Sequence, residues 1–521
     1  MVSKPEYFNF ATDIMGRWAR VQPDALGLWC VDARDGAESR FSFRQLDEAS
    51  RRGASFFHAC GLRQGSRVLV LLPRRPQWWH AMLGLIRAGA VPVPTSPLLT
   101  RRELEYRLEV AEIDAVISDP EGADKLAGYR GLRFITGADR PEWENFDRGT
   151  AAASPDFQGA PTRADDPGIL YFTSATTGDP KMVLHTQSSY GLGHEVTGKC
   201  WLDLKPGDVH WNLSDVGWGK AAWSSLYGPW HAGACVFGLD TRGRFEPVQA
   251  LDTLAQYPIT TWCAPPTAFR MVVRQDLARW RFPRLRHCVS AGEPLNPEVV
   301  LLWQAATGLT IYEAYGQTET VVAIGNFRSQ GFAVRLGSMG KAAPGFTVAL
   351  LDEAGNEVPD GVEGEIALRA APERPLGLFR EYWKNPAETA AHFRGDWYLT
   401  GDRATRDSDG YYWFVGRKDD VIKSSGYRIG PAEVENALCE HAAVLDAAVV
   451  GKPHALRGQI VKAFVILRPG WVSTEELKVQ LQKHCKKVAA PYKYPREIEF
   501  VPDLPKTTSG KTRRFELRQR A

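Results

Sequence analysis

Apolar residues follow two spacings in turn along the first part of this chain, which predicts alternating strands and helices. Residues 67–72 form an apolar run typical of a buried strand, and apolar side chains then recur at helical spacing from Trp79 to Ile86. Further short strands are predicted at 115–117 and 132–135. Strands separated by helices favour a mainly parallel sheet covered by helices.

The pattern changes further along the chain. A second stretch of alternating strands and helices runs through 170–172, 234–237 and 287–290. Beyond Gly337, short strands separated by turn residues predict a smaller β-rich subdomain. The final part alternates again, with strands at 447–450 and 463–467, and a Ser473-x-x-Glu476 capping box predicts the start of a helix. We therefore expect a small separate α+β domain at the end.

Length and composition exclude several classes of protein. A chain of 521 residues is long enough for about two to four domains. With 44% hydrophobic and 24% charged residues, it has an ordinary globular composition rather than that of a disordered chain or a coiled coil. No run of about twenty apolar residues predicts a membrane span. The first residues lack the pattern of a secretory signal or a transit peptide, so we expect a cytoplasmic protein.

Cysteine spacing and charge add two expectations. The eight cysteines lie far apart without zinc-type spacing, which predicts reduced core residues. The formal net charge of +3 is too small to predict nucleic-acid binding. Residues 420–521, however, hold 18 Lys and Arg against 11 Asp and Glu. This basic end either meets a polyanion or is a solvated face.

A hydroxyl-rich loop follows a predicted strand. Residues 173–181 read Thr-Ser-Ala-Thr-Thr-Gly-Asp-Pro-Lys and come directly after the apolar run 169–172. α/β proteins bind phosphates at the carboxyl ends of strands, and hydroxyls, backbone N–H groups and Lys181 can hold phosphate oxygens. The loop is not a Walker A motif, which would place Gly-Lys-Ser/Thr at a helix start. Taken alone, it would be interpreted as a polar surface turn.

Four more motifs follow this loop in a fixed order. They are Ser-Ala-Gly-Glu-Pro at 290–294, Tyr-Glu-Ala-Tyr-Gly-Gln-Thr-Glu-Thr at 312–320, Gly-Asp at 401–402 with the segment 416–429, and Pro-Lys-Thr-Thr-Ser-Gly-Lys at 505–511. Together the five resemble the adenylate-forming enzymes: acyl-CoA synthetases, luciferases and nonribosomal peptide adenylation domains. Within that superfamily the chain is most similar to the medium-chain acyl-CoA synthetases, nearly end to end, through words such as Ser-Asp-Val-Gly-Trp at 214–218.

The resemblance implies an activity and a domain division. A carboxylate and ATP would give acyl-AMP and pyrophosphate, and the thiol of coenzyme A would then displace AMP. The implied fold is α/β, with a large N-terminal domain of several subdomains at 1–418 and a small, mobile α+β domain at 419–521. Asp419 falls at the position where family members swivel the second domain. ATP, Mg²⁺ and coenzyme A are the implied cofactors, and a small carboxylic acid is the implied substrate.

The resemblance also implies roles for single residues. Lys511 would bridge the carboxylate and the α-phosphate, Thr318 would bind the α-phosphate, and Arg428 would lie near ribose and phosphate. Glu319 would hold Mg²⁺, and Trp218 would form a wall of the acyl pocket, while Trp223 and Trp230 are expected in the core. The residues expected to bind ATP or coenzyme A are Thr173, Ser174, Thr176, Thr177, Lys181, Gly292, Glu293, Pro294, Glu313, Tyr315, Gly316, Gln317, Asp402, Arg417, Ser425, Gly426, Lys493 and Arg496.

The resemblance gives some of these residues more specific roles. The two oxygens of Asp402 suit two ribose hydroxyls, and Tyr315 would lie against adenine. Lys493 and Arg496, beside two tyrosines, are the expected contacts of coenzyme A, and Gly426 would face the thiol. His185 is expected to be structural, because a carboxylate is already ionised and needs no general base.

Alternatives remain at this point. The acid is either a fatty acid or an aryl acid of the benzoate type, and the adenylate passes either to coenzyme A or to a carrier protein. Ala175 occupies a loop position where the family usually has Gly, and alanine at positive φ would cost about 1 kcal/mol. This departure motivates a further alternative, a nucleotide-binding regulator without turnover. A P-loop kinase or NTPase is disfavoured because no complete Walker motif exists.

Overall fold

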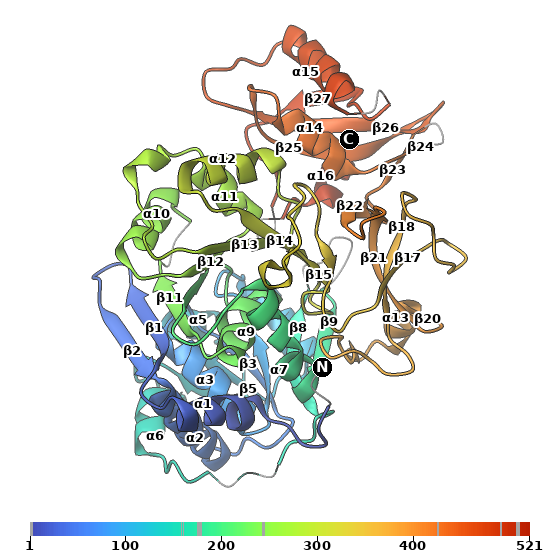
Figure 1. Ribbon diagram of the computed structural model, residues 1–521. Helices are drawn as coiled ribbons and strands as arrows, with labels where there is room; N and C mark the ends of the chain where they lie inside the picture. Colours follow the sequence, from blue (N-terminus) through green and yellow to red (C-terminus); the bar gives the residue numbers. More distant parts are fainter. Residues whose placement is uncertain are drawn as a thin grey trace.

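The computed structural model describes residues 4–157, 159, 161–173, 180–241, 245–424, 427–489, 492–506 and 511–521 (Figure 1). Ser174, Ala175, Thr176, Thr177, Ser425 and Gly426 lie outside the described residues, as does the side chain of Arg428. No helix among the described residues is long and apolar enough to cross a membrane. All eight cysteines are free thiols, and five of them are buried, as predicted for core residues.

The first sheet has five parallel strands in the order β4-β3-β5-β6-β7. The apolar run 67–72 and the helical spacing after it become β3 and α3, so this prediction is confirmed. The strands are β3 (Arg67–Leu71), β4 (Val91–Pro94), β5 (Ala115–Ser118), β6 (Leu132–Ile135) and β7 (Glu144–Asn145). The helices of this part are η1 (Phe10–Met15), α1 (Gly16–Val21), α2 (Phe43–Ala59), α3 (Pro76–Arg87), α4 (Arg101–Val110), α5 (Pro120–Lys125) and α6 (Phe146–Ala152).

The second sheet has nine strands in the order β16-β15-β14-β13-β12-β10-β11-β1-β2, with a parallel centre and antiparallel edges. The strands are β1 (Leu26–Asp32), β2 (Glu38–Ser42), β10 (Val209–Asn212), β11 (Cys235–Asp240), β12 (Thr261–Cys263), β13 (His287–Ala291), β14 (Ile311–Tyr315), β15 (Ile324–Gly325) and β16 (Lys341–Ala342). Large aromatic side chains join this sheet to its helices. The ring of Trp262 on β12 lies 4.7 Å from that of Phe269 on α11 and 5.6 Å from that of Trp303 on α12.

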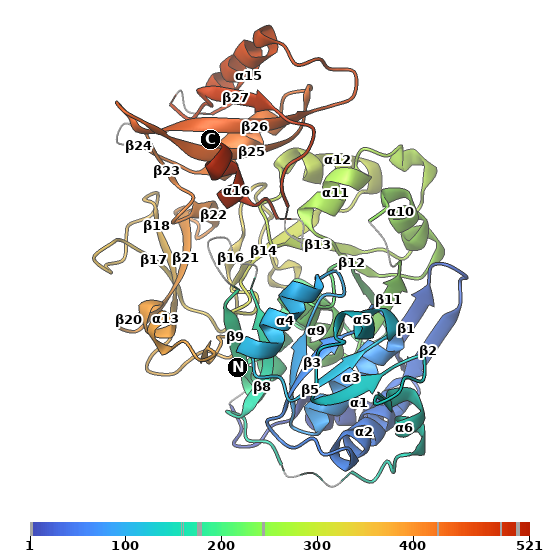
Figure 2. The same ribbon diagram turned by 180° about the vertical axis from the view of Figure 1, so that it is seen from behind.

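Helices surround this nine-stranded sheet (Figures 1 and 2). They are α7 (Gln187–Val196), η2 (Thr197–Trp201), α8 (Gly219–Ala222), η3 (Trp223–Tyr227), α9 (Gly228–His231), α10 (Pro247–Gln256), α11 (Pro266–Val272), η4 (Leu277–Arg279), α12 (Pro297–Thr307) and η5 (Arg328–Gln330).

The strand before the hydroxyl-rich loop corrects one expectation. β8 (Pro167–Phe172) exists where predicted, but it pairs antiparallel with β9 (Met182–Thr186), and β19 (Glu381–Tyr382) completes a small antiparallel sheet. The loop 173–181 therefore joins two strands of a hairpin rather than leaving a parallel strand. An apolar run specifies a buried strand but not the direction of its partner.

The β-rich subdomain predicted beyond Gly337 is confirmed. It is a five-stranded antiparallel sheet whose long central strand, β21, carries Asp402. Its elements are β17 (Val348–Leu351), β18 (Gly364–Arg369), α13 (Pro386–Ala391), β20 (Phe393–Arg394), β21 (Trp397–Arg406) and β22 (Tyr412–Arg417).

The last part of the chain has a sheet and a hydrophobic core of its own, shown in red at the top of Figure 1. Its elements are β23 (Ile422–Ser424), β24 (Tyr427–Ile429), α14 (Pro431–Cys439), β25 (Val444–His454), β26 (Gly458–Leu467), α15 (Glu475–Val488), β27 (Glu497–Phe500) and α16 (Arg514–Arg520). The predicted capping box is wrong by one residue. Thr474, not Ser473, caps α15 by accepting a hydrogen bond from the N–H of Leu477 at 3.1 Å. Both residue types are good caps, so the pattern does not separate them.

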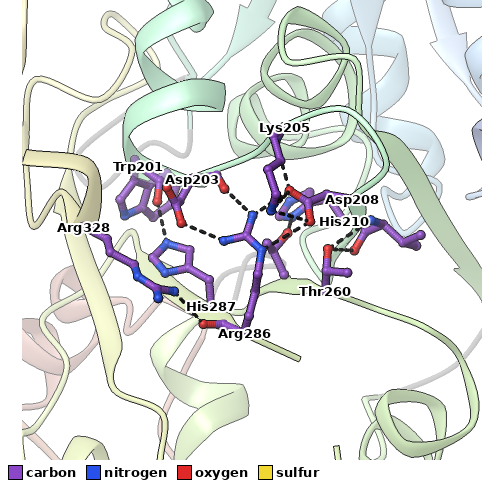
Figure 3. A network of polar contacts seen from close by, with 11 residues as sticks. Trp201, Asp203, Lys205, Asp208, His210, Thr260, Arg286, His287 and Arg328 are labelled. Carbon is purple, nitrogen blue, oxygen red and sulfur yellow. Dashed lines mark hydrogen bonds and ion pairs between the residues drawn. The ribbon is translucent and has the colours of Figure 1, made fainter. Parts of the chain in front are cut away.

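A polar network lies at the amino-terminal ends of the parallel strands in the nine-stranded sheet (Figure 3). Arg286, just before β13, donates hydrogen bonds to Asp203 at 2.7 Å and to Asp208 at 2.6 Å. The carbonyl of Arg286 accepts a bond from Arg328 at 3.0 Å. Because β10, β12 and β13 are parallel, their carboxyl ends lie together at the opposite end of these strands.

Candidate active site

Two adjoining cavities lie at the carboxyl ends of β13 and β14. The larger, about 930 Å³, is lined by residues of the nine-stranded sheet, the β-rich subdomain and the C-terminal part of the chain. The smaller, about 580 Å³, is lined by residues such as Trp211, Trp218 and Trp223. Six residues line both cavities, and we call them the shared wall: Gly292, Glu293, Gly316, Gln317, Thr318 and Lys511.

Two glycines allow the backbone of the shared wall to turn. Gly292, directly after β13, has a φ of +103°, a conformation that favours glycine. At Gly316, directly after β14, a β-carbon would lie 2.4 Å from the carbonyl oxygen of Val321. Gly292 is thus required by its backbone conformation, and Gly316 by the close approach of the Val321 main chain.

Asp402 is held by donors from the nine-stranded sheet. Its Oδ2 accepts hydrogen bonds from the hydroxyl of Tyr315 and from Nε2 of Gln317, each at 2.7 Å. Nε of Arg417 lies 3.8 Å from its Oδ1. Burial raises the pKa of Asp402, and the charge of Arg417 and these donors oppose that rise. The carboxylate is therefore fixed in direction at the wall of the larger cavity.

The main chain of Thr318 is anchored from behind. Its carbonyl accepts hydrogen bonds from Nε2 of His185 at 2.8 Å and from the hydroxyl of Tyr190 at 2.6 Å. Burial lowers the pKa of His185 to about 3, so the ring is neutral and donates through Nε2. His185 was expected to be structural. The structure gives it a definite partner, the predicted phosphate-binding residue.

Glu319 is a buried carboxylate beside the larger cavity. Its Oε1 accepts a hydrogen bond from the hydroxyl of Tyr382 at 2.8 Å. Among the described residues, no group of three or more His, Cys, Asp or Glu is arranged to hold a metal ion. Mg²⁺ is commonly held by one or two carboxylates together with substrate phosphates. A single carboxylate therefore fits a magnesium ion that arrives with a nucleotide.

The base of the hydroxyl-rich loop is closed by its two ends. The N–H of Thr173 donates to the carbonyl of Lys181 at 2.9 Å, and the N–H of Lys181 donates to the hydroxyl of Thr173 at 3.2 Å. The ammonium of Lys181 pairs with Glu388 and lies 5.0 Å from the ring centre of Tyr382. Both ends line the larger cavity, while the predicted contacts Ser174, Thr176 and Thr177 fall outside the described residues.

Other predicted residues divide into those that reach a cavity and those that do not. The larger cavity is lined by Pro294, Glu313, Tyr315, Asp402, Arg417 and Asp419. Trp218 lines the smaller cavity as expected of a pocket wall, and Trp230 is fully buried. Trp223 is buried in the hydrophobic core, as expected, and it also lines the smaller cavity.

Lys493 and Arg496 do not line either cavity. Lys493 forms an ion pair with Glu433 at 2.7 Å, and the guanidinium of Arg496 lies 5.0 Å from the ring centre of Tyr494. Both belong to the C-terminal part of the chain. Their contact with coenzyme A stays a prediction.

Sequence reasoning missed Lys220. It lines the smaller cavity and donates a hydrogen bond to the carbonyl of Ala291 at 2.8 Å. The available signal was a single lysine inside the otherwise uncharged stretch 216–230.

The fold and the cavities define an α/β protein whose C-terminal part contributes a lysine to the junction of two cavities. Comparisons with known proteins specify the family. Residues 15–383 match the AMP-binding enzyme model, and residues 433–511 match the AMP-binding enzyme C-terminal domain. The chain belongs to the AMP-binding enzyme family, and the predicted resemblance is confirmed.

Its relatives are acyl-coenzyme A synthetases. The mitochondrial acyl-coenzyme A synthetase ACSM3 of Mus musculus is 47% identical over 531 residues, covering 99% of this chain and 91% of the relative. The mitochondrial acyl-coenzyme A synthetase ACSM5 of Homo sapiens is 45% identical over 529 residues, covering 99% and 90%.

Solved structures of aryl-acid ligases are also similar. The anthranilate CoA ligase AuaEII in complex with anthranoyl-AMP has a TM-score of 0.89 at 29% identity and covers 99% of this chain and 98% of the ligase. The benzoate CoA ligase from Burkholderia xenovorans LB400 has a TM-score of 0.86 at 30% identity, with coverage of 98% and 100%.

Proposed function

We propose that this chain is an ATP-dependent acyl-CoA synthetase. It activates a carboxylic acid as acyl-AMP with release of pyrophosphate, then transfers the acyl group to coenzyme A with release of AMP. The observation that carries the proposal is the position of Lys511. Although it comes from the C-terminal end of the chain, it lines both cavities at the shared wall.

The first half-reaction brings two anions together. The nucleotide occupies the larger cavity, the acid occupies the smaller one, and the carboxylate meets the α-phosphate at the shared wall. An ammonium group at this point offsets the repulsion and stabilises the charge that develops in the transition state. Lys511 supplies that ammonium, and Thr318 donates a hydrogen bond to the α-phosphate.

The larger cavity holds the nucleotide through groups already oriented in the fold. Asp402 accepts the two ribose hydroxyls, and the ring of Tyr315 lies against adenine together with the turn 292–294. Arg417 and Arg428 lie near the ribose and the phosphates. Glu319 would hold Mg²⁺, which supplies positive charge to the phosphate oxygens when bound. Thr173 and Lys181 complete the phosphate contacts.

The second half-reaction requires Lys511 to leave the shared wall. Asp419 is our proposed hinge, because it lies between the β-rich sheet and the C-terminal sheet. Rotation there would bring Gly426 toward the thiol, while Lys493 and Arg496 would contact the phosphates of coenzyme A. The basic composition of residues 420–521 supports an anionic cofactor on this side.

The chemistry of the smaller cavity supports an apolar acid. Three tryptophans and four prolines line it beside residues of both charges, and together with the resemblance to medium-chain synthetases they support a medium-chain fatty acid as the proposed substrate. A benzoate-like acid is the second candidate, because anthranilate and benzoate ligases share the fold. The relatives carry the word mitochondrial in their names, whereas this sequence predicts a cytoplasmic enzyme, and the compartment stays a prediction.

A pyrophosphate-release assay tests the proposal. The purified protein is incubated with ATP and Mg²⁺ and a panel of fatty and aromatic acids, with and without coenzyme A. We expect acid-dependent pyrophosphate release and acyl-CoA formation, with highest kcat/KM for fatty acids of medium length. Highest activity with aryl acids would favour the second candidate, and adenylate without thioester would favour a carrier-protein acceptor. ATP binding without any acid-dependent pyrophosphate release would contradict the proposal.

A further inference from the structure

The ammonium of Lys181 is paired with a carboxylate from another subdomain. Lys181 ends the hydroxyl-rich loop and directly precedes β9, whereas its partner Glu388 belongs to α13 of the β-rich subdomain. The pairing of β19 with β9 brings the two segments together, and the N–H of Trp383 donates to the carbonyl of Met182 at 2.7 Å. Both charged groups line the larger cavity, and neither is among the described residues that line the smaller one. The pair therefore belongs to the nucleotide side of the site.

The carboxylate of Glu388 is held in place by its own helix. Its N–H donates to Oδ1 of Asn385, the cap of α13, at 3.0 Å. Its Oε1 also faces Nε2 of His392, one helical turn later, at 3.2 Å. The hydrogen bond from Lys181 lowers the pKa of Glu388, and so does His392, while burial opposes them. The carboxylate is therefore ionised at neutral pH, and a ring nitrogen stays beside it when Lys181 moves.

The ion pair is open to exchange with a stronger anion. The side chain of Lys181 is 41% exposed and that of Glu388 is 31% exposed. Water screens a pair of this kind, so the pair holds the ammonium only weakly. A phosphate group carries more negative charge than a carboxylate and offers three strong acceptor oxygens. A nucleotide phosphate that reaches Lys181 can therefore take its ammonium from Glu388.

The place of the pair selects the phosphates that leave. In the proposed reaction, the α-phosphate meets the acid at the shared wall, which includes Thr318 and Lys511. Lys181 is not part of this wall, so we expect its ammonium to meet the phosphates that lie further from the acid. These two phosphates become the departing pyrophosphate. A carboxylate beside Lys181 then competes with the product for the same ammonium.

We propose that Glu388 is a counter-ion that holds Lys181 between turnovers and competes with the β- and γ-phosphates for its ammonium. This inference rests on the proposed function. Glu388 weakens the binding of ATP, and it weakens the binding of pyrophosphate by the same means, so it favours release of that product. Glu388 is a positioning residue, because it acts on the phosphates through Lys181.

The test measures binding to the full chain by calorimetry, with Mg²⁺ present, for pyrophosphate and for AMP in separate titrations. AMP lacks the two phosphates concerned and is the matched ligand. For Glu388→Gln we expect the Kd for pyrophosphate to fall about fourfold, within the range for an exposed ion pair, and the Kd for AMP to stay within about twofold of wild type. Glu381→Gln is the control and should match wild type, because this carboxylate lies 3.6 Å from Arg380 on the same segment.

A second arm asks whether the effect passes through Lys181. In the Lys181→Met background, Glu388→Gln should change the Kd for pyrophosphate by less than about twofold. Direct repulsion between the carboxylate and the phosphates would instead give equal tightening in both backgrounds, which would overturn the proposal. If pyrophosphate binds Lys181→Met too weakly for a Kd, the selective effect of Glu388→Gln on pyrophosphate over AMP decides the question.

These titrations need neither acid nor turnover, so they separate the inference from the proposed function. A wild type that binds pyrophosphate but shows no acid-dependent pyrophosphate release would contradict the proposed function. An active wild type whose pyrophosphate affinity is unchanged or reduced in Glu388→Gln would overturn the inference alone. Equal tightening of AMP would also overturn it, because that is the result of a general change in the site, and so would failure of both proteins to bind pyrophosphate. If Glu388→Gln does not fold by circular dichroism, Glu388→Ala is measured by the same criteria.

Discussion

The hydroxyl of Tyr315 donates a hydrogen bond to Asp402 at 2.7 Å, which joins the nine-stranded sheet to the β-rich subdomain. Tyr315→Phe removes this donor and leaves the buried carboxylate held by Gln317 and the more distant Arg417. We expect the KM for ATP to rise about tenfold, because the charged hydrogen bond contributes about 1.5 kcal/mol, with little change in the KM for the acid. Pyrophosphate exchange with varied ATP measures this. Tyr411→Phe, whose hydroxyl contacts the carbonyl of Ala333, is the matched control, and an unchanged KM for ATP in Tyr315→Phe would contradict the role of Asp402.

His185 and Tyr190 both donate to the carbonyl of Thr318, so their effects on adenylation should not be additive. Tyr190→Phe and His185→Gln are each expected to lower the kcat of adenylation by about fivefold, since each weakens the same anchor. The reduction in kcat of the double variant should differ from the product of the two single reductions. The difference corresponds to a coupling free energy of about 0.5 kcal/mol or more. A double-mutant cycle on kcat measures the coupling. Strict additivity would show that the two side chains act separately.

Lys511→Ala should separate the two half-reactions. Adenylation is expected to fall about a hundredfold or more, because no other C-terminal ammonium is described at the shared wall. Thioester formation from purified acyl-AMP and coenzyme A should stay within about threefold of wild type, since that step follows departure of the lysine. Arg520→Ala, an exposed residue near the same chain end, serves as the control. Adenylation at the wild-type rate in Lys511→Ala would refute the proposed role.

The carboxyl of Glu313 should make the free energy of unfolding depend on pH between the ordinary pKa of a carboxyl and the raised pKa of this group. Burial raises the pKa of its carboxyl to about 8, while the N–H of Leu295, which donates at 2.9 Å, opposes this. The unfolded carboxyl ionises near pH 4.5, so the stabilising contribution of the protonated group is present below that pH and is lost as the pH rises toward 8. Glu313→Gln removes this loss. The thermal midpoint of the variant should gain on that of wild type from pH 5 to pH 8 and then level off, and a constant difference would contradict the raised pKa.

Arg286→Met should lower the stability of the protein, because it disrupts the network at the amino-terminal ends of the strands. The candidate active site at the carboxyl ends should stay unchanged. Burial of Asp208 would raise its pKa, but the hydrogen bonds and charge of Arg286, together with hydrogen bonds from the Lys205 backbone and from Thr260, outweigh burial and lower it (Figure 3). Removal of the arginine leaves this carboxylate without its main partner, at a cost of about 3 kcal/mol. Thermal midpoints at pH 7 measure the loss, with exposed Arg284→Ala as the control. Because the pKa of Asp208 is lowered, the stabilisation exists above the ordinary carboxyl pKa and should shrink as the pH falls below about 4.

The motifs that carry the family resemblance predicted residues that line the larger cavity. Tyr315, Gln317 and Asp402 are far apart in the chain, yet each carries a group that suits a nucleotide, and the fold brings all three together. Strand and helix patterns were sufficient for the first sheet and the β-rich subdomain, since burial sets their periodicity.

The remaining features depend on tertiary contacts that no local pattern contains. The antiparallel pairing of β8 follows from its neighbours in space, and the place of Trp223 at a cavity depends on the packing of η3. Lys220 belongs to no sequence motif, and only the folded structure shows that it lies beside Ala291, next to the shared wall. The anchoring of Thr318 by His185 likewise joins residues 133 positions apart.

The tail that carries Lys511 is fastened to the proposed hinge. Arg518 donates to the carbonyl of Asp419 at 3.2 Å and to the carboxylate of Asp420 at 2.7 Å, and Arg514 donates twice to Glu435 at 2.7 Å. Hydrogen bonds from Arg518 therefore tie the helix that follows Lys511 to Asp419 and Asp420. If Asp419 is the hinge that we propose, a turn of the backbone there would withdraw Lys511 in the same movement, so that departure of the ammonium and opening for the thiol would be one event.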